Sequence, residues 1–213
     1  MSIATIVIIA ANVIASIKGF NDFTFFEKYK FNIGAIKRGE QIRNITSGFL
    51  HVDFTHLIFN MITLYFFAPI VVGFFGDPKF LIIYFVSLLF GSLLSLGIHK
   101  DEYHYSAVGA SGAVTGILYS AILLNPDMRL AFFFVPIPIP AFIFGIGYLL
   151  YSIYGMKNRI GNIGHTAHFG GAIGGYVMTL FLRPSLISQE PLMVVLLAIP
   201  IVILFAMEKF GKI

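Results

Sequence analysis

The sequence has no cysteine among its 213 residues, and this absence removes several kinds of chemistry. Without thiols the chain has no disulfide framework, no thiolate metal site and no cysteine nucleophile. Charged residues are also scarce, because they form only 11% of the chain where a soluble domain has about 25%. So low a charge content excludes an ordinary soluble domain.

Hydrophobic residues take the place of the missing charges, at 58% of the chain and a mean hydropathy of +0.89. A helix needs about 20 apolar residues to cross a bilayer, and a spanning segment must satisfy its own backbone hydrogen bonds. We therefore predict an all-α membrane protein, a polytopic bundle of transmembrane helices. Its predicted spans are the apolar runs 3–17, 57–75, 80–98, 111–124, 131–154, 165–182 and 192–207.

The net charge of +4 does not indicate a nucleic-acid partner. Lysine and arginine stand singly or in pairs between the apolar runs, whereas a nucleic-acid-binding protein gathers them on one face. We interpret them as loop charges of a protein whose partner is the lipid bilayer. The sequence has no feature that specifies an oligomeric state.

Two segments depart from the plain pattern of spans. The 19–50 connection mixes charged with aromatic residues, which favour the membrane interface, so we predict an interfacial loop there. Pro136, Pro138 and Pro140 exclude a regular helix before about residue 140, because proline is tolerated only at a helix start.

The run 111–124 is short for a span. As a helix it would cover about 21 Å, against about 30 Å of hydrocarbon. Non-helical backbone at membrane depth is tolerated only where it is buried in protein or lines a watery cavity. We therefore expect the residues before Ser111 to descend into a water-filled pocket.

Polar side chains inside apolar spans are costly and mark function by default. Ser111 could act as a nucleophile if a base such as His168 took its proton. His56 and Asn60 share one helix face and, with the backbone N–H of Ser111, could stabilise an oxyanion. Since no aspartate or glutamate lies within the later spans, we predict a dyad rather than a triad.

Glycine pairs with four-residue spacing occur on the helices of both dyad residues. They are Gly112 with Gly116 and Gly171 with Gly175. Small residues at this spacing let helix backbones approach closely, which would bring Ser111 and His168 within reach. The alternative is that such pairs are common in membrane helices and indicate packing alone.

Zinc binding is the competing use of the histidines. His165 and His168, with His51 or His56, could form an imidazole site. However, the chain has no H-E-x-x-H motif and no acidic residue in a span to complete it. We predict neither a metal nor another cofactor.

Four motifs follow one another between residues 39 and 182. They are Arg43 with I-T-S-G-F-L-H after it, H-x-x-x-x-H-x-x-x-N from His51 to Asn60, G-A-S-G-A at 109–113 and A-H-F-G-G at 167–171. In these motifs the sequence resembles the rhomboid family of intramembrane serine proteases. The resemblance implies a six-helix catalytic core over 1–185, including the 19–50 loop, and an additional C-terminal helix over 186–213.

The resemblance also implies roles for individual residues. Ser111 would be the nucleophile, His168 the general base, and His56, Asn60 and the Ser111 amide the oxyanion donors. The implied substrates are transmembrane proteins, cut in or near a spanning segment at small residues, with no cofactor. The chain would be a multi-pass protein of the cell membrane.

Two positions depart from the family pattern. Ile42 stands where many members have tryptophan, which puts the anchoring of the 19–50 loop in question. Thr115 stands where an aromatic ring commonly packs against the histidine. Either the base is held less rigidly here, or Tyr119 or a phenylalanine elsewhere supplies the ring.

Two other functions compete with proteolysis. A proteolytically silent relative would bind and escort membrane proteins, but such relatives typically lose the serine or the histidine, and both are present. A transporter would line a pathway with its polar residues. The absence of acidic residues within the spans and of paired broken helices argues against that reading.

Two arguments give opposite membrane orientations for the chain. The resemblance implies a cytoplasmic N-terminus and a serine open to the opposite side. Only three of the 14 basic residues (Lys79, Arg129 and Arg183) would then be cytoplasmic, and the positive-inside rule favours the reverse. We adopt the family orientation, because much of the excess lies in the aromatic 19–44 segment, which would insert together with its neighbours.

Overall fold

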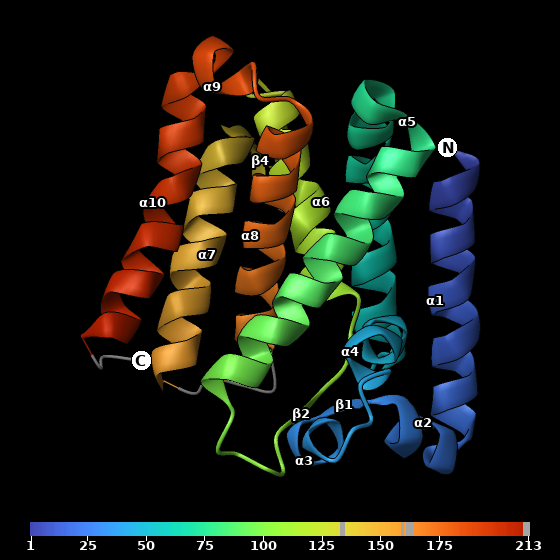
Figure 1. Cartoon of the computed structure of the whole chain (residues 1–213). Helices are drawn as coiled ribbons and strands as arrows, with labels where there is room; N and C mark the ends of the chain where they lie inside the picture. The colour runs from blue at the N-terminus through green and yellow to red at the C-terminus, as the bar shows by residue number, and fades with distance from the viewer. Residues whose placement is uncertain (133–134, 159, 161–163, 211–213) are drawn as a thin grey trace.

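The structure is a computed structural model that describes residues 1–132, 135–158, 160 and 164–210, and it forms a bundle of α-helices (Figure 1). Its longer helices are α1 (Ile3–Asn21), α5 (Phe54–Ile98), α6 (Ser111–Leu124), α7 (Ala141–Asn158), α8 (His165–Leu182) and α10 (Pro191–Lys209). The short α9 (Leu186–Gln189) joins α8 to α10. The all-α fold class is therefore confirmed.

Two of the predicted spans, 57–75 and 80–98, form the two arms of α5. The arms meet at Gly76, whose φ of 74° and ψ of 170° interrupt the helix. A positive φ suits glycine, because glycine has no Cβ. Pro78 follows at the start of the second arm, where its fixed φ is compatible with a new helix. The chain turns back at this point, and the second arm returns through the bundle (Figure 1).

Three helices of the described chain, α1, α5 and α10, are long and apolar enough to cross a membrane. The 45 residues of α5 suffice for two crossings at about 20 residues each. Large apolar side chains also cover the outside of the bundle: Phe59 is 68% exposed and Phe181 is 75% exposed. A surface of this kind matches lipid rather than water. The chain is an integral membrane protein.

The 19–50 segment is more ordered than the loop that its sequence predicts. It contains α2 (Phe23–Tyr29), β1 (Phe31–Asn32), α3 (Ile33–Lys37), α4 (Arg43–Thr46) and the 3₁₀ helix η1 (Ser47–Phe49). The side chains of Asp22 and Asn32 cap α2 and α3, each accepting a backbone N–H at 2.9 Å. Such caps stabilise helices that are too short to show in an apolar pattern.

Arg43 anchors this segment. Its Nη1 donates to the carbonyl oxygens of Glu27 and Lys30, at 2.8 and 2.9 Å, and its guanidinium pairs with Glu40 at 2.7 Å. Ile42 is 58% exposed, so much of its side chain lies at the surface. The segment is thus fixed through the arginine, although Ile42 replaces the expected tryptophan.

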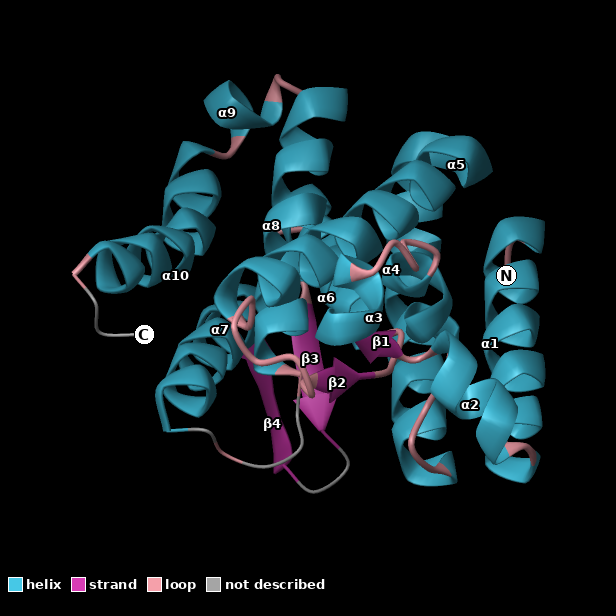
Figure 2. Ribbon diagram, turned by 60° about the horizontal axis from the view of Figure 1, so that its bottom comes forward, coloured by secondary structure: helices cyan, strands magenta, loops and turns pink. Residues whose placement is uncertain are grey.

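The described residues also form two short strand pairs (Figure 2). In the first, β1 lies antiparallel to β2 (Ser106–Ala107), which ties the chain before Ser111 to the 19–50 segment. In the second, β3 (Arg129–Phe132) pairs with β4 (Val135–Pro140). This strand pair corrects the predicted span 131–154, of which residues 131–132 and 135–140 are extended and not helical.

The alternating prolines explain this correction. Proline lacks an N–H donor and clashes with the preceding turn of a helix, so Pro136, Pro138 and Pro140 keep the backbone extended. The regular helix α7 begins at Ala141, directly after the last of them. The proline pattern therefore located the start of α7 correctly.

Candidate active site

The helices α6 and α8 pack with their backbones in contact. A Cβ atom at Gly171 would overlap the carbonyl oxygen of Gly112, and one at Gly175 would overlap that of Gly116. These four residues are the two glycine pairs of the sequence. Helices that meet through such residues approach more closely than ordinary side chains permit.

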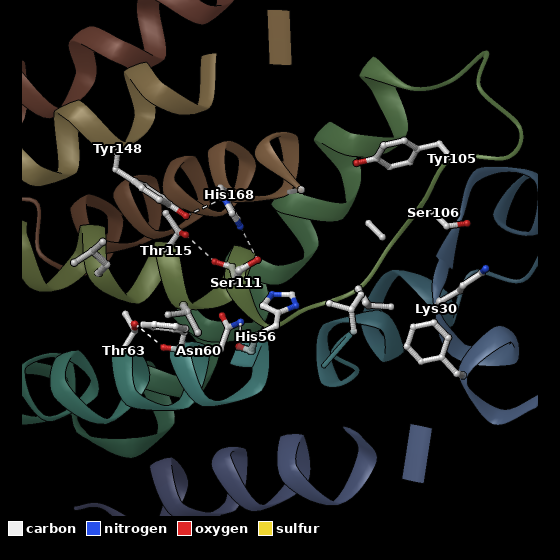
Figure 3. A pocket seen from close by; sticks show the side chains of 18 of the residues that line it. Lys30, His56, Asn60, Thr63, Tyr105, Ser106, Ser111, Thr115, Tyr148 and His168 are labelled. Carbon is white, nitrogen blue, oxygen red and sulfur yellow. Dashed lines mark hydrogen bonds between the residues drawn. The ribbon is translucent and has the colours of Figure 1, made fainter. Parts of the chain in front are cut away.

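This close packing brings Ser111 and His168 together. Ser111 opens α6, and His168 lies in the first turn of α8. The serine Oγ lies 2.7 Å from Nε2 of His168, a normal hydrogen-bond distance (Figure 3). The imidazole is largely buried, with 7% of the residue exposed. In this geometry the imidazole can take the serine proton.

The second ring nitrogen of His168 contacts Tyr148 of α7. The tyrosine hydroxyl lies 2.8 Å from Nδ1 of His168 (Figure 3). The two rings are also stacked, with centroids 5.5 Å apart and an interplanar angle of 27°. The histidine is therefore held on both sides.

Tyr148 is the site residue that the sequence did not reveal, and it corrects the expectation for Tyr119. The hydroxyl of Tyr119 instead donates to the carbonyl oxygen of Gly145 at 2.8 Å. Thr115 donates to the carbonyl oxygen of Ser111 at 2.7 Å. The missing ring at position 115 left two alternatives open, a less rigidly held histidine or a ring from elsewhere, and it gave no way to choose the helix that supplies the ring.

His56 and Asn60 lie in the first turns of α5 and line the same cavity as the serine and the histidine (Figure 3). The side chain of Asp53 caps this helix by accepting the backbone N–H of His56 at 2.7 Å. Asn60 donates one amide hydrogen to the carbonyl oxygen of His56 at 3.0 Å. An amide nitrogen carries two hydrogens, so the second remains available for a ligand.

Gly109 explains how the ring of His56 comes close to Ser111. Its φ of 133° lies in a region that residues with side chains avoid. A Cβ atom at this position would stand 2.7 Å from Cε1 of His56 and 3.5 Å from Oγ of Ser111. The glycine of the G-A-S-G-A motif is thus required both by the backbone and by the imidazole next to it.

His51 is not among the described residues that line the cavity. It holds the segment of chain that precedes Ser111. It is fully buried, its Nδ1 contacts Oγ of Ser16 at 2.8 Å, and its Nε2 accepts the N–H of Ala110 at 3.4 Å. Burial lowers the pKa of His51 to about 3, so the ring is neutral and can accept this hydrogen bond. His51 therefore connects α1 to the residue that precedes Ser111.

The cavity beside these residues has a volume of about 760 Å³. It extends from the dyad to Lys30 and Tyr105, and apolar side chains such as Leu118 and Phe144 form part of its wall. Before Ser111 the chain runs as the short β2 and then without regular structure to Ala110. The expected non-helical descent into a pocket is therefore present.

The histidines considered as candidate zinc ligands contact other groups of the protein. His165 directs Nε2 to the carbonyl oxygen of Ile160 at 3.3 Å, and its ring meets that of His168 edge-on. Within the described part of the chain, no three histidine or acidic side chains are grouped to hold a metal ion.

Comparisons with known proteins agree with this architecture. The model of the Rhomboid domain matches residues 38–185. RHOMBOID-like protein 12, mitochondrial, of Arabidopsis thaliana is 33% identical over 182 residues, which is 78% of this chain and 54% of that protein. Rhomboid protein 1, mitochondrial, of Saccharomyces cerevisiae is 29% identical over 70% of this chain and 44% of its own length.

A bacterial relative carries a name that states an activity. Rhomboid protease GluP of Bacillus subtilis is 32% identical over 143 residues, which is 66% of this chain and 26% of that protein. The chain spans about half, or less, of the length of these curated relatives. The matched domain, however, contains the whole of the α5–α6–α8 packing unit with Ser111 and His168. This chain belongs to the rhomboid family.

Proposed function

We propose that the chain is an intramembrane serine endopeptidase that hydrolyses peptide bonds in or near the transmembrane segments of other membrane proteins. One observation carries this proposal: the 2.7 Å contact between Ser111 Oγ and His168 Nε2 at the wall of a large cavity. The contact pairs a nucleophile with a base inside an apolar bundle, where polar groups are costly.

The proposed reaction is acyl transfer in two steps. Oγ of Ser111 attacks the carbonyl carbon of the substrate, and its proton passes to Nε2 of His168. The imidazolium then gives this proton to the leaving amine, and the substrate remains as an ester on Ser111. Water hydrolyses the ester with His168 again as base, which releases the acid product and restores the serine.

The negative charge that develops on the substrate oxygen requires donors. The backbone N–H of Ser111 lies at the first turn of α6, where N–H groups have no acceptor within the helix and the helix dipole is positive. The free amide hydrogen of Asn60 and the ring of His56 supply the others. Together they form the proposed oxyanion hole.

Purified protein in liposomes, incubated with a labelled single-span membrane protein that has small residues in its span, tests the proposal. We expect two fragments from wild type and none from Ser111→Ala. A fluorophosphonate probe should label wild type and leave the variant unlabelled. Stable binding of the substrate without cleavage, and no probe labelling, would instead support a non-catalytic binding protein.

Asn60→Ala and His56→Ala are each expected to lower kcat by roughly 10–10³-fold, the scale of losing one oxyanion donor. KM should change little, because the donors act mainly on charge that appears in the transition state. Steady-state cleavage of the labelled substrate measures both constants. Thr63→Ala is the matched control, since Thr63 also lines the cavity from α5 but bonds to Phe59 of its own helix. Equal effects of all three changes would contradict the assignment.

The proposed location is the cell membrane, with the N-terminus in the cytoplasm. Asp101 and Asp127 are exposed and lie in turns, Asp101 after α5 and Asp127 after α6. The turn after α6 lies at the end of the bundle that holds the N-terminus, and the turn after α5 lies at the opposite end (Figure 1). The chain has no native cysteine, so the variants Asp101→Cys and Asp127→Cys each carry one thiol. On intact cells, a membrane-impermeant maleimide should label Asp101→Cys and spare Asp127→Cys.

Both variants must react after the cells are solubilised, which controls for access to the thiol. The reverse pattern on intact cells would mean that the cavity opens to the cytoplasm, as the distribution of basic residues favours. Protection of both thiols until lysis would place the protein in an internal membrane, a result of interest because two of the relatives are named as mitochondrial.

A further inference from the structure

The base of the proposed dyad is held by a residue from a third helix. Ser111 and His168 belong to α6 and α8, whereas Tyr148, which contacts the other face of the imidazole, belongs to α7. Its hydroxyl lies 2.8 Å from Nδ1 and its ring is stacked on the imidazole (Figure 3). Both contacts act on a single ring and fix its position and its rotation.

The hydrogens in this contact can be assigned from the reaction. A base that takes the proton of Ser111 needs a free lone pair on Nε2, so the neutral imidazole must carry its hydrogen on Nδ1. Nδ1–H then donates to the hydroxyl oxygen of Tyr148. The phenol keeps a hydrogen of its own.

The geometry points to Tyr148 as the positioning residue of the catalytic base, which selects the tautomer of His168 that directs a lone pair toward Ser111. This inference rests on the proposed function and deepens it. In serine proteases with a triad, a carboxylate orients the histidine. Here the described residues that line the cavity include no carboxylate, and the phenol occupies the corresponding place at Nδ1. Its oxygen also accepts from the imidazolium that forms during the reaction.

The inference links the base to the packing of α7. The helices α6 and α8 are fixed to each other by glycine contacts, but Tyr148 reaches His168 only while α7 lies against α8. The hydroxyl of Tyr119 also contacts α7, because it donates to the carbonyl oxygen of Gly145. Two tyrosine hydroxyls therefore make contacts at α7, and of these two only the hydroxyl of Tyr148 contacts His168.

Tyr148→Phe removes the hydroxyl and keeps the ring that stacks on His168. We expect kcat to fall by about 10–100-fold, the scale of losing a hydrogen bond that orients a functional histidine, with KM within about 3-fold of wild type. The rate of fluorophosphonate labelling at Ser111 should fall by a similar factor, because it reports activation of the nucleophile without a protein substrate. Tyr119→Phe is the matched control and should leave both rates near wild type.

A spectroscopic readout separates positioning from general stability. With ¹⁵N-labelled histidine, the ring nitrogens of His168 should show a single Nδ1–H tautomer in wild type and a mixture in Tyr148→Phe; the spectrum of His168→Asn assigns the signals. An unchanged tautomer with an unchanged labelling rate would overturn the inference, as would equal losses in Tyr148→Phe and Tyr119→Phe. Failure of the proposed function is distinct: wild type itself would neither cleave nor be labelled at Ser111.

Discussion

Replacing Ser111 by alanine is expected to reduce cleavage to background, a loss of about 10³-fold or more, because the proposed ester intermediate can no longer form. The fold should survive, since alanine is the most favourable residue in a helix and Ser111 opens α6. Cleavage of a fluorescent transmembrane substrate in liposomes measures the loss. Thermal unfolding in detergent measures whether the bundle is intact.

Ser106→Ala is the control for this change. Ser106 is another serine on the cavity wall. Its Oγ accepts from the side chain of Asn32 at 3.0 Å and donates to the backbone carbonyl oxygen of His104 at 3.3 Å, and neither partner is an imidazole ring. This variant should retain wild-type cleavage. Activity of folded Ser111→Ala above background, or an equal loss in Ser106→Ala, would refute the choice of nucleophile.

His168→Ala is expected to be nearly as damaging as the serine change, because nucleophile and base act as a unit. The double variant Ser111→Ala/His168→Ala should then be no less active than either single variant. Such non-additivity distinguishes two parts of one reaction from two independent structural defects. Single-turnover cleavage and probe labelling of all three proteins provide the measurement.

The neighbouring histidine of α8 controls for the loss of a buried ring. His165 is also buried, but its Nε2 faces a backbone carbonyl oxygen and not the serine. We expect His165→Ala to retain activity wherever it remains folded. If His165→Ala were inactive and His168→Ala active, with both folded, the base would have been assigned to the wrong histidine.

The sequence predicted the helices and the proposed dyad for a common reason. A bilayer makes polar side chains and unpaired backbone groups costly, so long apolar runs locate helices and the few polar residues within them are conspicuous. Ser111 and His168 were identified in this way, and the structure places their reactive atoms 2.7 Å apart. The short helices of the 19–50 segment escaped detection because polar caps, not apolar runs, define them.

By itself the sequence determined the membrane insertion of the chain, the order of its helices and the start of α7 after Pro140, and it singled out the two residues of the proposed dyad. Only the tertiary structure decided which side chain supports the base. All faces of α6 from Gly112 to Leu124 are buried, so its apolar pattern does not show which neighbour each face meets. Tyr148 and Tyr119 look alike in such a sequence, and the packing of α7 against α8 alone brings Tyr148 to His168.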